Sequence, residues 1–322
     1  MRQSVRGVRS VELALADPAR AARFFSEVWH LDPVVEEQGA FYLRGTCSYH
    51  HIVALHPSYG PPNVRRVVYD AVDVAMVDAL HTKVAASGVA CEKPDALRMA
   101  GGGYGFGFLD PSGRALAIVS GVEDHAERGP VPDRPAKITH INYNDTDPVR
   151  LRDFYIDVLG FRFVDHAGRQ FFMHADCPDH SSVVICDAEA NTLNHLSFEM
   201  DTLDSVMRGA GRMMDHGYPI EWGIGRHGAA ANVFAYFAGP EEMPLEYSSD
   251  GLKIDDSYPF NGPEHWKWPP NRLDQWGVTP PHTRRWKRIQ TLFDFDARHW
   301  RLTSCEDAAA GERFLATSAP GA

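Results

Sequence analysis

The 322-residue sequence contains no long hydrophobic run. None of its apolar stretches approaches the roughly 20 residues that a helix needs to cross a bilayer. The N-terminal stretch MRQSVRGVRSVELALADPARAARFF also lacks the uninterrupted apolar core of an export signal. We therefore expect a cytoplasmic protein without a membrane partner. A content of 44% hydrophobic and 23% charged residues is typical of a globular protein, and the length suits two domains of about 150 residues each.

Paired cysteines and positive charge are also scarce. The sequence has five cysteines and no CxxC pair, which fits reduced thiols better than a disulfide framework; they are Cys47, Cys91, Cys177, Cys186 and Cys305. A net charge of −11 disfavours a nucleic acid as partner. The one basic stretch, HTRRWKRIQ at 282–290, we interpret as a solvated helix face.

An internal repeat organises the chain. Residues 8–34 align with residues 138–164 at an offset of 130, so that Asp17-Pro18 matches Asp147-Pro148. Each copy reads as a short alternating strand followed by a helix that begins at the Asp-Pro pair. Short β-rich runs separated by turns follow each helix, and a second strand–helix unit then appears in each half.

These patterns predict an α+β protein of two domains, each made of two paired βαβββ modules. We place the first domain at 1–122, a linker rich in proline and charge at 123–137, and the second domain at 138–250. The extension at 251–322 is rich in proline and tryptophan and has no clear periodicity. Its segment 264–277 could fold over a site as a lid or serve as a structural strap.

Three polar side chains of the second half stand on strands with apolar opposite faces. They are His140 in KITHINYND, His195 in LNHLSFEM and Glu246 in PLEYSS. Two imidazoles and one carboxylate form the ligand set that holds Fe(II) and leaves coordination positions open. A single histidine in a strand is more often a hydrogen-bonded structural residue.

The repeat favours a functional role for this set. Carried back by 129–130 residues, the three positions fall on Ser10, Arg66 and Ala117, none of which is an equivalent ligand. A purely structural role would be expected in both copies. We therefore predict a metal site in the second half and a metal-free first half.

At these residues the chain resembles the type I extradiol ring-cleavage dioxygenases of the vicinal oxygen chelate superfamily. The resemblance covers roughly residues 5–250 and includes the three predicted ligands. His180, in CPDHSSVV, falls where the family has its acid–base histidine. His227 and Tyr236 fall where the family has a second-sphere histidine and tyrosine, and Asn142 is similar to some members.

The resemblance implies a vicinal oxygen chelate, or glyoxalase-like, fold. It also implies an enzyme that uses Fe(II), or Mn(II), and O₂ to cleave a catechol-type aromatic to a muconic semialdehyde-type product, and a homo-oligomeric assembly. His140, His195 and Glu246 would hold the metal. His180 would act on the oxygen side, while His227 and Tyr236 would hydrogen-bond the deprotonating catechol oxygen.

The substrate pocket is less well marked in the sequence. Phe172 and Trp222 could line an aromatic pocket, although such residues are as typical of a core, and Arg272 could read a substrate carboxylate. Trp222 stands near the position at which carboxylate-reading relatives carry an arginine, which argues against an acidic catechol.

Other functions remain open at this point. A 4-hydroxyphenylpyruvate dioxygenase-like enzyme shares the two histidines and the glutamate, but does not call for His180, His227 and Tyr236 together. A non-catalytic superfamily member could sequester an aromatic ligand in the same cavity. A glyoxalase-like isomerase would draw ligands from more than one module, against which Ser10 and Ala117 argue.

Overall fold

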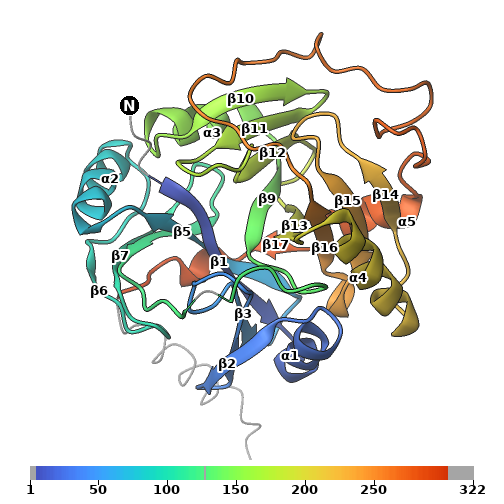
Figure 1. Ribbon diagram of the computed structural model, residues 1–322. Coiled ribbons are helices and arrows are strands. Elements are labelled where there is room, and N and C mark those ends of the chain that lie inside the picture. The colour runs from blue at the N-terminus through green and yellow to red at the C-terminus, as the bar shows by residue number, and fades with distance from the viewer. Residues whose placement is uncertain (1–4, 127, 304–322) are drawn as a thin grey trace, which may run out of the picture.

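Two β-sheets of similar topology, one from each half of the chain, form the molecule (Figure 1). The structure is a computed structural model that describes residues 5–126 and 128–303. Within these residues, none of the helices has the length and apolarity needed to span a bilayer. The four cysteines in the described part of the chain are all free, as the sequence predicts.

The first half contains two successive βαβββ modules. Its strands form one sheet in the order β2-β3-β4-β1-β5-β8-β7-β6, in which β1 and β5 lie side by side. The elements are β1 Val5–Leu15, α1 Pro18–Glu27, β2 Asp32–Glu37, β3 Ala40–Arg44, β4 Val53–Pro57, β5 Asn63–Ala71, α2 Val74–Ala86, β6 Asp95–Ala96, β7 Tyr104–Leu109 and β8 Ala115–Ser120.

The second half repeats this arrangement in the order β10-β11-β12-β9-β13-β16-β15-β14. The elements are β9 Ile138–Asp145, α3 Pro148–Asp157, β10 Arg162–Ala167, β11 Gln170–His174, β12 Val183–Asp187, β13 Leu193–Glu199, α4 Leu203–Asp215, β14 Trp222–Arg226, β15 Val233–Ala238, η1 Pro240–Glu242 and β16 Pro244–Ser249. The α+β class with paired βαβββ modules is therefore confirmed, while the exact domain limits stay a prediction.

The repeated Asp-Pro pairs begin helices in both halves. Asp17 caps α1 by accepting a hydrogen bond from the backbone N–H of Arg20 at 2.9 Å, and Asp147 caps α3 in the same way. The proline that follows each cap fits the first helical position, where no backbone N–H is needed. The two copies thus start their helices by the same local chemistry.

The two halves share a buried interface that holds the second sheet in place. Trp29, which follows α1, is fully buried and stacks on Tyr247 of β16 with ring centroids 3.8 Å apart. The hydroxyl of Tyr69 lies 2.8 Å from that of Tyr143 and 3.0 Å from that of Tyr155. Such aromatic contacts fix the strand that carries Glu246 against the first half.

The C-terminal extension joins both halves. It leaves β16, passes over the second half, forms α5 at Arg284–Ile289, and then adds the short strand β17, Asp294–Phe295, parallel to β5 of the first sheet (Figure 1). The one-turn helix η2, Ala297–His299, follows. The sequence did not predict β17, since a two-residue strand leaves no periodicity. Residues 304–322, with Cys305, lie outside the described residues.

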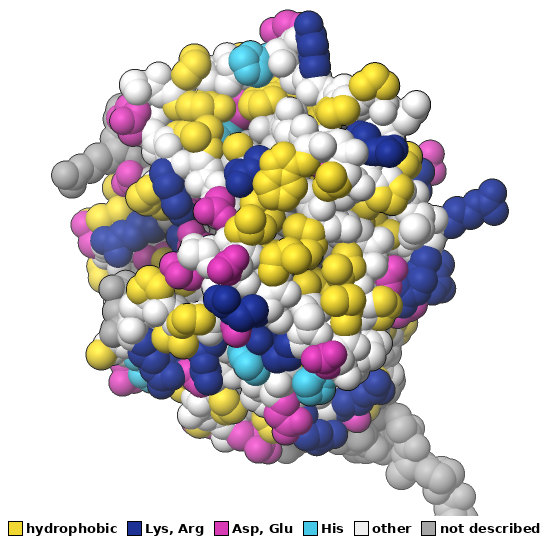
Figure 2. Space-filling model, turned by 45° about the vertical axis from the view of Figure 1, so that its right-hand side comes forward, with side chains coloured by type: hydrophobic (Ala, Val, Ile, Leu, Met, Phe, Trp, Pro, Cys, Tyr) yellow, Lys and Arg dark blue, Asp and Glu magenta, His cyan; other side chains and the backbone are white. Residues whose placement is uncertain are grey.

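The basic stretch of the extension forms α5 as an amphipathic turn. Trp286 is fully buried against the second half, whereas Arg285, Lys287 and Arg288 are exposed, as expected for a solvated basic face. Figure 2 brings the right-hand side of Figure 1 forward and shows hydrophobic side chains gathered on that face. The exposed large hydrophobic side chains of the extension are Leu252, Phe260, Leu273, Trp276 and Val278.

Candidate metal centre and its cavity

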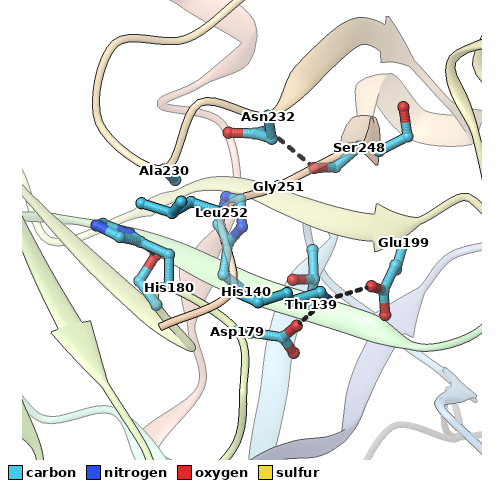
Figure 3. A pocket seen from close by; sticks show the side chains of 13 residues that line it. Thr139, His140, Asp179, His180, Glu199, Ala230, Asn232, Ser248, Gly251 and Leu252 are labelled. Atoms are coloured by element: carbon cyan, nitrogen blue, oxygen red, sulfur yellow. Dashed lines mark hydrogen bonds and ion pairs between the residues drawn. The ribbon is translucent and has the colours of Figure 1, made fainter. Parts of the chain in front are cut away.

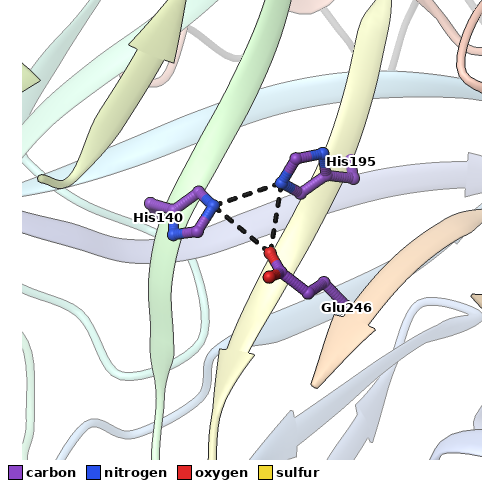
Figure 4. Close-up of side chains that lie close together, drawn as sticks. All are labelled: His140, His195 and Glu246. Carbon is purple, nitrogen blue, oxygen red and sulfur yellow. Dashed lines mark hydrogen bonds and ion pairs between the residues drawn. The ribbon is translucent and has the colours of Figure 1, made fainter. Parts of the chain in front are cut away.

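The three predicted ligands meet on three adjacent strands. His140 on β9 and Glu246 on β16 both lie opposite Ser197 of β13, and His195 stands two residues before Ser197 on the same strand. The Nε2 atoms of the two histidines are 3.1 Å apart, and they lie 3.3 and 3.2 Å from Oε2 of Glu246 (Figure 4). Sheet register thus brings together residues that are 106 positions apart in sequence.

This spacing fits one small cation. Ligand bonds of about 2.1 Å place neighbouring donor atoms roughly 3.0 to 3.4 Å apart at octahedral to tetrahedral angles. Oε2 of Glu246 is buried and has no hydrogen-bond partner among the described residues. Three lone-pair donors around one shared point suit a divalent ion.

The electrostatics of the set keep its members in the forms that bind metal. Burial lowers the pKa of His195 to about 4, so its imidazole is neutral at pH 7. Burial acts to raise the pKa of Glu246, but the imidazole nitrogens of His140, His195 and His227 close to its carboxylate outweigh burial and hold the pKa well below its usual range. The centre therefore offers a neutral imidazole from His195 and a carboxylate from Glu246, with the imidazole of His140 beside them.

The first half places other residues at the same sheet positions. Ser10 and Ala117 both lie opposite Val68, as His140 and Glu246 lie opposite Ser197. Arg66, at the position of His195, places its guanidinium 3.0 Å from a carboxylate oxygen of Glu12. Within the described residues, the set in the second half is the only His, Cys or carboxylate cluster with metal-binding geometry.

A second layer of polar residues surrounds Glu246. The ring nitrogen Nε2 of His227 lies 2.9 Å from the hydroxyl of Tyr236 and 3.7 Å from Oε1 of Glu246. The amide of Asn232 donates to Oε1 of Glu246 at 3.2 Å and to Ser248 at 2.8 Å. Burial and the nearby carboxylate raise the pKa of Tyr236 well above its ordinary value, so its hydroxyl stays protonated.

A cavity of about 370 Å³ opens onto the metal centre. Its lining includes His140, His195, His227 and Tyr236, and the predicted substrate residues Asn142, Phe172 and Trp222. The extension supplies part of the wall, through Trp268, Leu273, His282 and Gln290. The segment 264–277 therefore borders the cavity, as expected for either a lid or a strap.

Arg272 is the predicted pocket residue that the structure does not bring to this cavity. Its side chain is exposed and donates hydrogen bonds to the carbonyl of Gly277 at 2.8 Å and of Asn271 at 3.1 Å. The nearby Arg226 also lies outside the lining, with its guanidinium over the ring of Trp276, 5.1 Å from the centroid. The guanidinium of Arg272 therefore binds carbonyls of the turn at 271–277 and not a group in the cavity.

His180 lies beside the centre but outside the main cavity lining. It borders a small polar space of about 30 Å³ that it shares with His140 and Asp179 (Figure 3). Its Nε2 is 2.5 Å from Oδ2 of the fully buried Asp165, and its Nδ1 is 3.4 Å from the hydroxyl of Ser181. His180 precedes β12, and His195 lies on β13. These two strands pair with opposite edges of β9, so β9 lies between them.

Several residues of this site were missed in the sequence. Asp165 had a usable signal, because its counterpart in the first half is Val35 while the counterpart of His180 is His50. Asn194 had a similar signal, since its counterpart is Arg65, but Gln290 had none, because the extension is not repeated; Asn232 was likewise missed. Their roles emerge only from the contacts.

Comparisons with known proteins agree with this architecture. The family model described as Glyoxalase/Bleomycin resistance protein/Dioxygenase superfamily matches residues 7–118 and 137–247. The chain is 31% identical over 118 residues, or 36% of its length, to metapyrocatechase 2 of Cupriavidus necator, and this match spans 37% of that relative. It is 23% identical over 270 residues to the manganese-dependent 2,3-dihydroxybiphenyl 1,2-dioxygenase of Geobacillus genomosp. 3, covering 76% of this chain and 85% of the relative.

Solved structures show the same fold. The Mn(II)-bound glyoxalase from Novosphingobium aromaticivorans aligns with a TM-score of 0.81 and 30% identity, covering 88% of this chain and 96% of that one. An anaerobic complex of homoprotocatechuate 2,3-dioxygenase from Brevibacterium fuscum with 3,4-dihydroxyphenylacetate aligns with a TM-score of 0.79 and 20% identity, covering 89% and 92%.

Proposed function

The chain belongs to the Glyoxalase/Bleomycin resistance protein/Dioxygenase superfamily, and from this premise we propose that it is an extradiol dioxygenase. It would open the ring of a catechol-type substrate with O₂ and give a muconic semialdehyde-type product. The observation that carries the proposal is the His140, His195 and Glu246 set at the inner end of a cavity with aromatic walls. The names of two sequence relatives, a metapyrocatechase and a 2,3-dihydroxybiphenyl 1,2-dioxygenase, support it.

His140, His195 and Glu246 would hold one ion, which we propose is Fe(II), with Mn(II) as the second choice. Such an ion supplies a redox-active centre at which a catechol and O₂ can react. A divalent ion bound by one carboxylate and two neutral imidazoles gives a site of net charge +1, which one catechol monoanion would neutralise. Burial of the site favours this neutral balance over binding of the dianion.

Tyr236 and His227 would hydrogen-bond the catechol oxygen and accept the proton that it releases. Tyr236 keeps its proton, and its hydroxyl lies 2.9 Å from Nε2 of His227, so the pair can donate to a catechol oxygen and accept a proton in turn. The buried Oδ1 of Asn142, which lines the same cavity, has no hydrogen-bond partner among the described residues. It would accept a hydrogen bond from a substrate hydroxyl.

His180 would serve as the acid–base residue on the oxygen side. A buried carboxylate that holds one imidazole nitrogen fixes the orientation of the ring. Asp165 holds Nε2 of His180 in this way. In the first half, Val35 occupies the strand position equivalent to Asp165. The Asp–His pair is thus specific to the half that carries the metal ligands.

The cavity favours a catechol without an anionic substituent. Among the described residues of its lining, the one arginine is Arg169, whose side chain is 65% exposed. His282 is uncharged at pH 7, because burial lowers its pKa to about 4. Trp222, whose indole N–H donates to the carbonyl of Pro280 at 2.9 Å, is an uncharged part of the lining. These walls suit an apolar ring substituent, and they offer little to the 2-oxo acid of a 4-hydroxyphenylpyruvate dioxygenase-like reaction.

A glyoxalase-type isomerase is the second candidate. The observation in its favour is the Mn(II)-bound glyoxalase that aligns with nearly the whole described chain at 30% identity. The His180–Asp165 pair fits both reactions, because isomerisation of a hemithioacetal also requires proton transfer, so the two candidates are separated by O₂ uptake. A binding protein that sequesters an aromatic ligand would need neither this pair nor a metal.

One assay separates the three functions. Protein loaded anaerobically with Fe(II) is mixed with oxygenated catechol, 3-methylcatechol or 3,4-dihydroxyphenylacetate while O₂ and the yellow ring-opened product are recorded. We expect O₂ uptake that matches product formation, faster with the uncharged catechols. Glu246→Gln should abolish it, and Glu189→Gln, an exposed control in the same half, should not. Isomerisation of a hemithioacetal without O₂ uptake would favour the glyoxalase.

A further inference from the structure

Gln290 of the C-terminal extension lies at the start of a hydrogen-bond network that ends on His195. We propose that Gln290 is a positioning residue which, through Asn194, fixes the tautomer and orientation of His195. This inference rests on the metal site of the proposed function, but not on the reaction catalysed there. It makes the extension a part of the metal centre as well as a cover for the cavity.

The network runs through side-chain amides that are largely buried. Nδ1 of His195 lies 2.8 Å from Oδ1 of Asn194, and the side-chain amide of Gln290 donates to this same oxygen at 2.7 Å. The amide nitrogen of Asn194 donates to Oδ1 of Asn144 at 2.8 Å. Asn144 in turn donates to the backbone carbonyl of Gln290 at 2.7 Å and to the hydroxyl of Thr192 at 2.9 Å.

These contacts permit one orientation of the Asn194 amide. Turned by 180°, its NH₂ group would face the NH₂ group of Gln290, and its oxygen would face the oxygen of Asn144. The backbone carbonyl of Gln290 cannot rotate in this way, and it fixes the amide of Asn144 as an acceptor toward Asn194. Gln290 therefore acts twice, through its side chain and through its main chain.

The consequence falls on the metal ligand. Because Asn194 presents an oxygen, Nδ1 of His195 must carry the proton, which leaves the lone pair of Nε2 directed at His140 and Glu246. Asn194 is 7% exposed and His195 is 3% exposed, so water cannot easily replace the amide. Loss of such a partner typically lowers metal affinity on the order of 10- to 100-fold.

The first half offers a natural comparison. Its counterparts of Asn194 and Asn144 are Arg65 and Ala14, so neither amide of the network is repeated where the ligands are missing. Gln290 has no counterpart in the repeat, since it lies in the extension. The asparagine side chains of the network therefore occur only in the half that carries the metal ligands.

The test measures Mn(II) affinity of the full-length protein by electron paramagnetic resonance of free Mn(II). Gln290→Glu places an acceptor against the oxygen of Asn194, and because Asn144 opposes a turn of that amide, the repulsion should displace the oxygen of Asn194 from Nδ1 of His195. We expect its affinity to fall 10-fold or more, that of Gln290→Met to fall about 3- to 10-fold, and that of Asn194→Asp to stay within about 3-fold of the parent, since a carboxylate still accepts from Nδ1. Lys287→Met, on the exposed face of α5, is the control and should bind as the parent does.

The outcomes separate this inference from the proposed function. Parent-like affinity of both Gln290 variants would overturn the inference while leaving ring cleavage untouched. An equal loss in Asn194→Asp and Gln290→Glu would also overturn it, because the effect would then follow from packing and not from the acceptor oxygen. If Gln290→Glu does not fold, Gln290→Met and Asn194→Asp still decide the question. A protein that binds Mn(II) with the expected order of affinities but cleaves no catechol would support the inference and contradict the proposed function.

Discussion

The pairing of His180 with Asp165 leads to a prediction with two separable parts. Asp165 is fully buried and accepts from three groups, namely His180 at 2.5 Å, Asn261 at 2.8 Å and Tyr258 at 3.1 Å. His180→Phe removes the shortest of these contacts and leaves a buried carboxylate undersatisfied, which should lower the free energy of unfolding by about 3 kcal/mol. His180→Gln can still donate to Asp165 and should cost about 1 kcal/mol.

Turnover should respond differently, because glutamine cannot transfer a proton at neutral pH. Both variants should lose on the order of 10²-fold in kcat, or about 2.7 kcal/mol in the barrier, as expected for loss of one acid–base group. Iron content and anaerobic catechol binding should stay near those of the parent, whereas His195→Phe should lose iron. The comparison of kcat with thermal unfolding distinguishes the acid–base role from a structural ion pair.

The first half supplies the matched control for this experiment. His50 stands at the repeat position of His180, but Val35 replaces Asp165 there. His50→Gln should therefore leave kcat unchanged. Turnover by His180→Gln within about 3-fold of the parent, or loss of metal from it, would refute the acid–base assignment and leave the pair a structural one.

Three further predictions concern the ligands, the first half and the extension. Metal analysis should give about one ion per chain, and Glu246→Gln should lose most of it, since it removes the only anionic ligand of the set; a stoichiometry near two would contradict the metal-free first half. Burial opposes ionisation of Glu12, yet Arg66 and its other cationic neighbours lower its pKa to about 2 from 4.5, so its contribution of about 3 kcal/mol to the free energy of unfolding is present above pH 4.5 and is lost as the pH falls through 2. Acid titrations of Glu12→Gln should lack this component, and an unchanged pH profile would contradict it. Trp268→Ala should raise KM or uncouple O₂ uptake from product, because Trp268 forms part of the cavity wall; unchanged kinetics would favour a strap.

The C-terminal extension makes three separate contacts, so a truncation changes more than one feature of the molecule. Truncation at about residue 250 would remove Trp268 from the cavity wall, but also Gln290 from the support of His195 and β17 from the first sheet. Its effect on KM could not be assigned to a lid alone. Single substitutions such as Trp268→Ala separate these roles.

The sequence predicted those parts of the site that depend on repeats and strand periodicity. His140, His195 and Glu246 were found because period-two patterns place them on one sheet face and because Ser10, Arg66 and Ala117 stand in the other copy. The structure confirms that these positions share the same register in both sheets. The Asp-Pro helix starts were predictable because a cap is a local interaction.

The remaining features depend on contacts between distant segments. The hydrogen bond from Gln290 to Asn194 joins residues 96 positions apart, and Gln290 lies in the extension, outside the repeat. Arg272 was predicted as a residue that could bind a substrate carboxylate, but its side chain donates to carbonyls of a local turn instead. The homo-oligomeric state and the cytoplasmic location stay predictions.

The central claim is that the metal set in the second half supports ring cleavage by O₂. It is tested most directly by recording O₂ consumption and ring-opened product together, with a catechol and protein reconstituted with Fe(II). We predict one O₂ consumed per product formed, with activity proportional to bound metal up to about one ion per chain. Metal-loaded protein that binds the catechol but consumes no O₂ would contradict the claim.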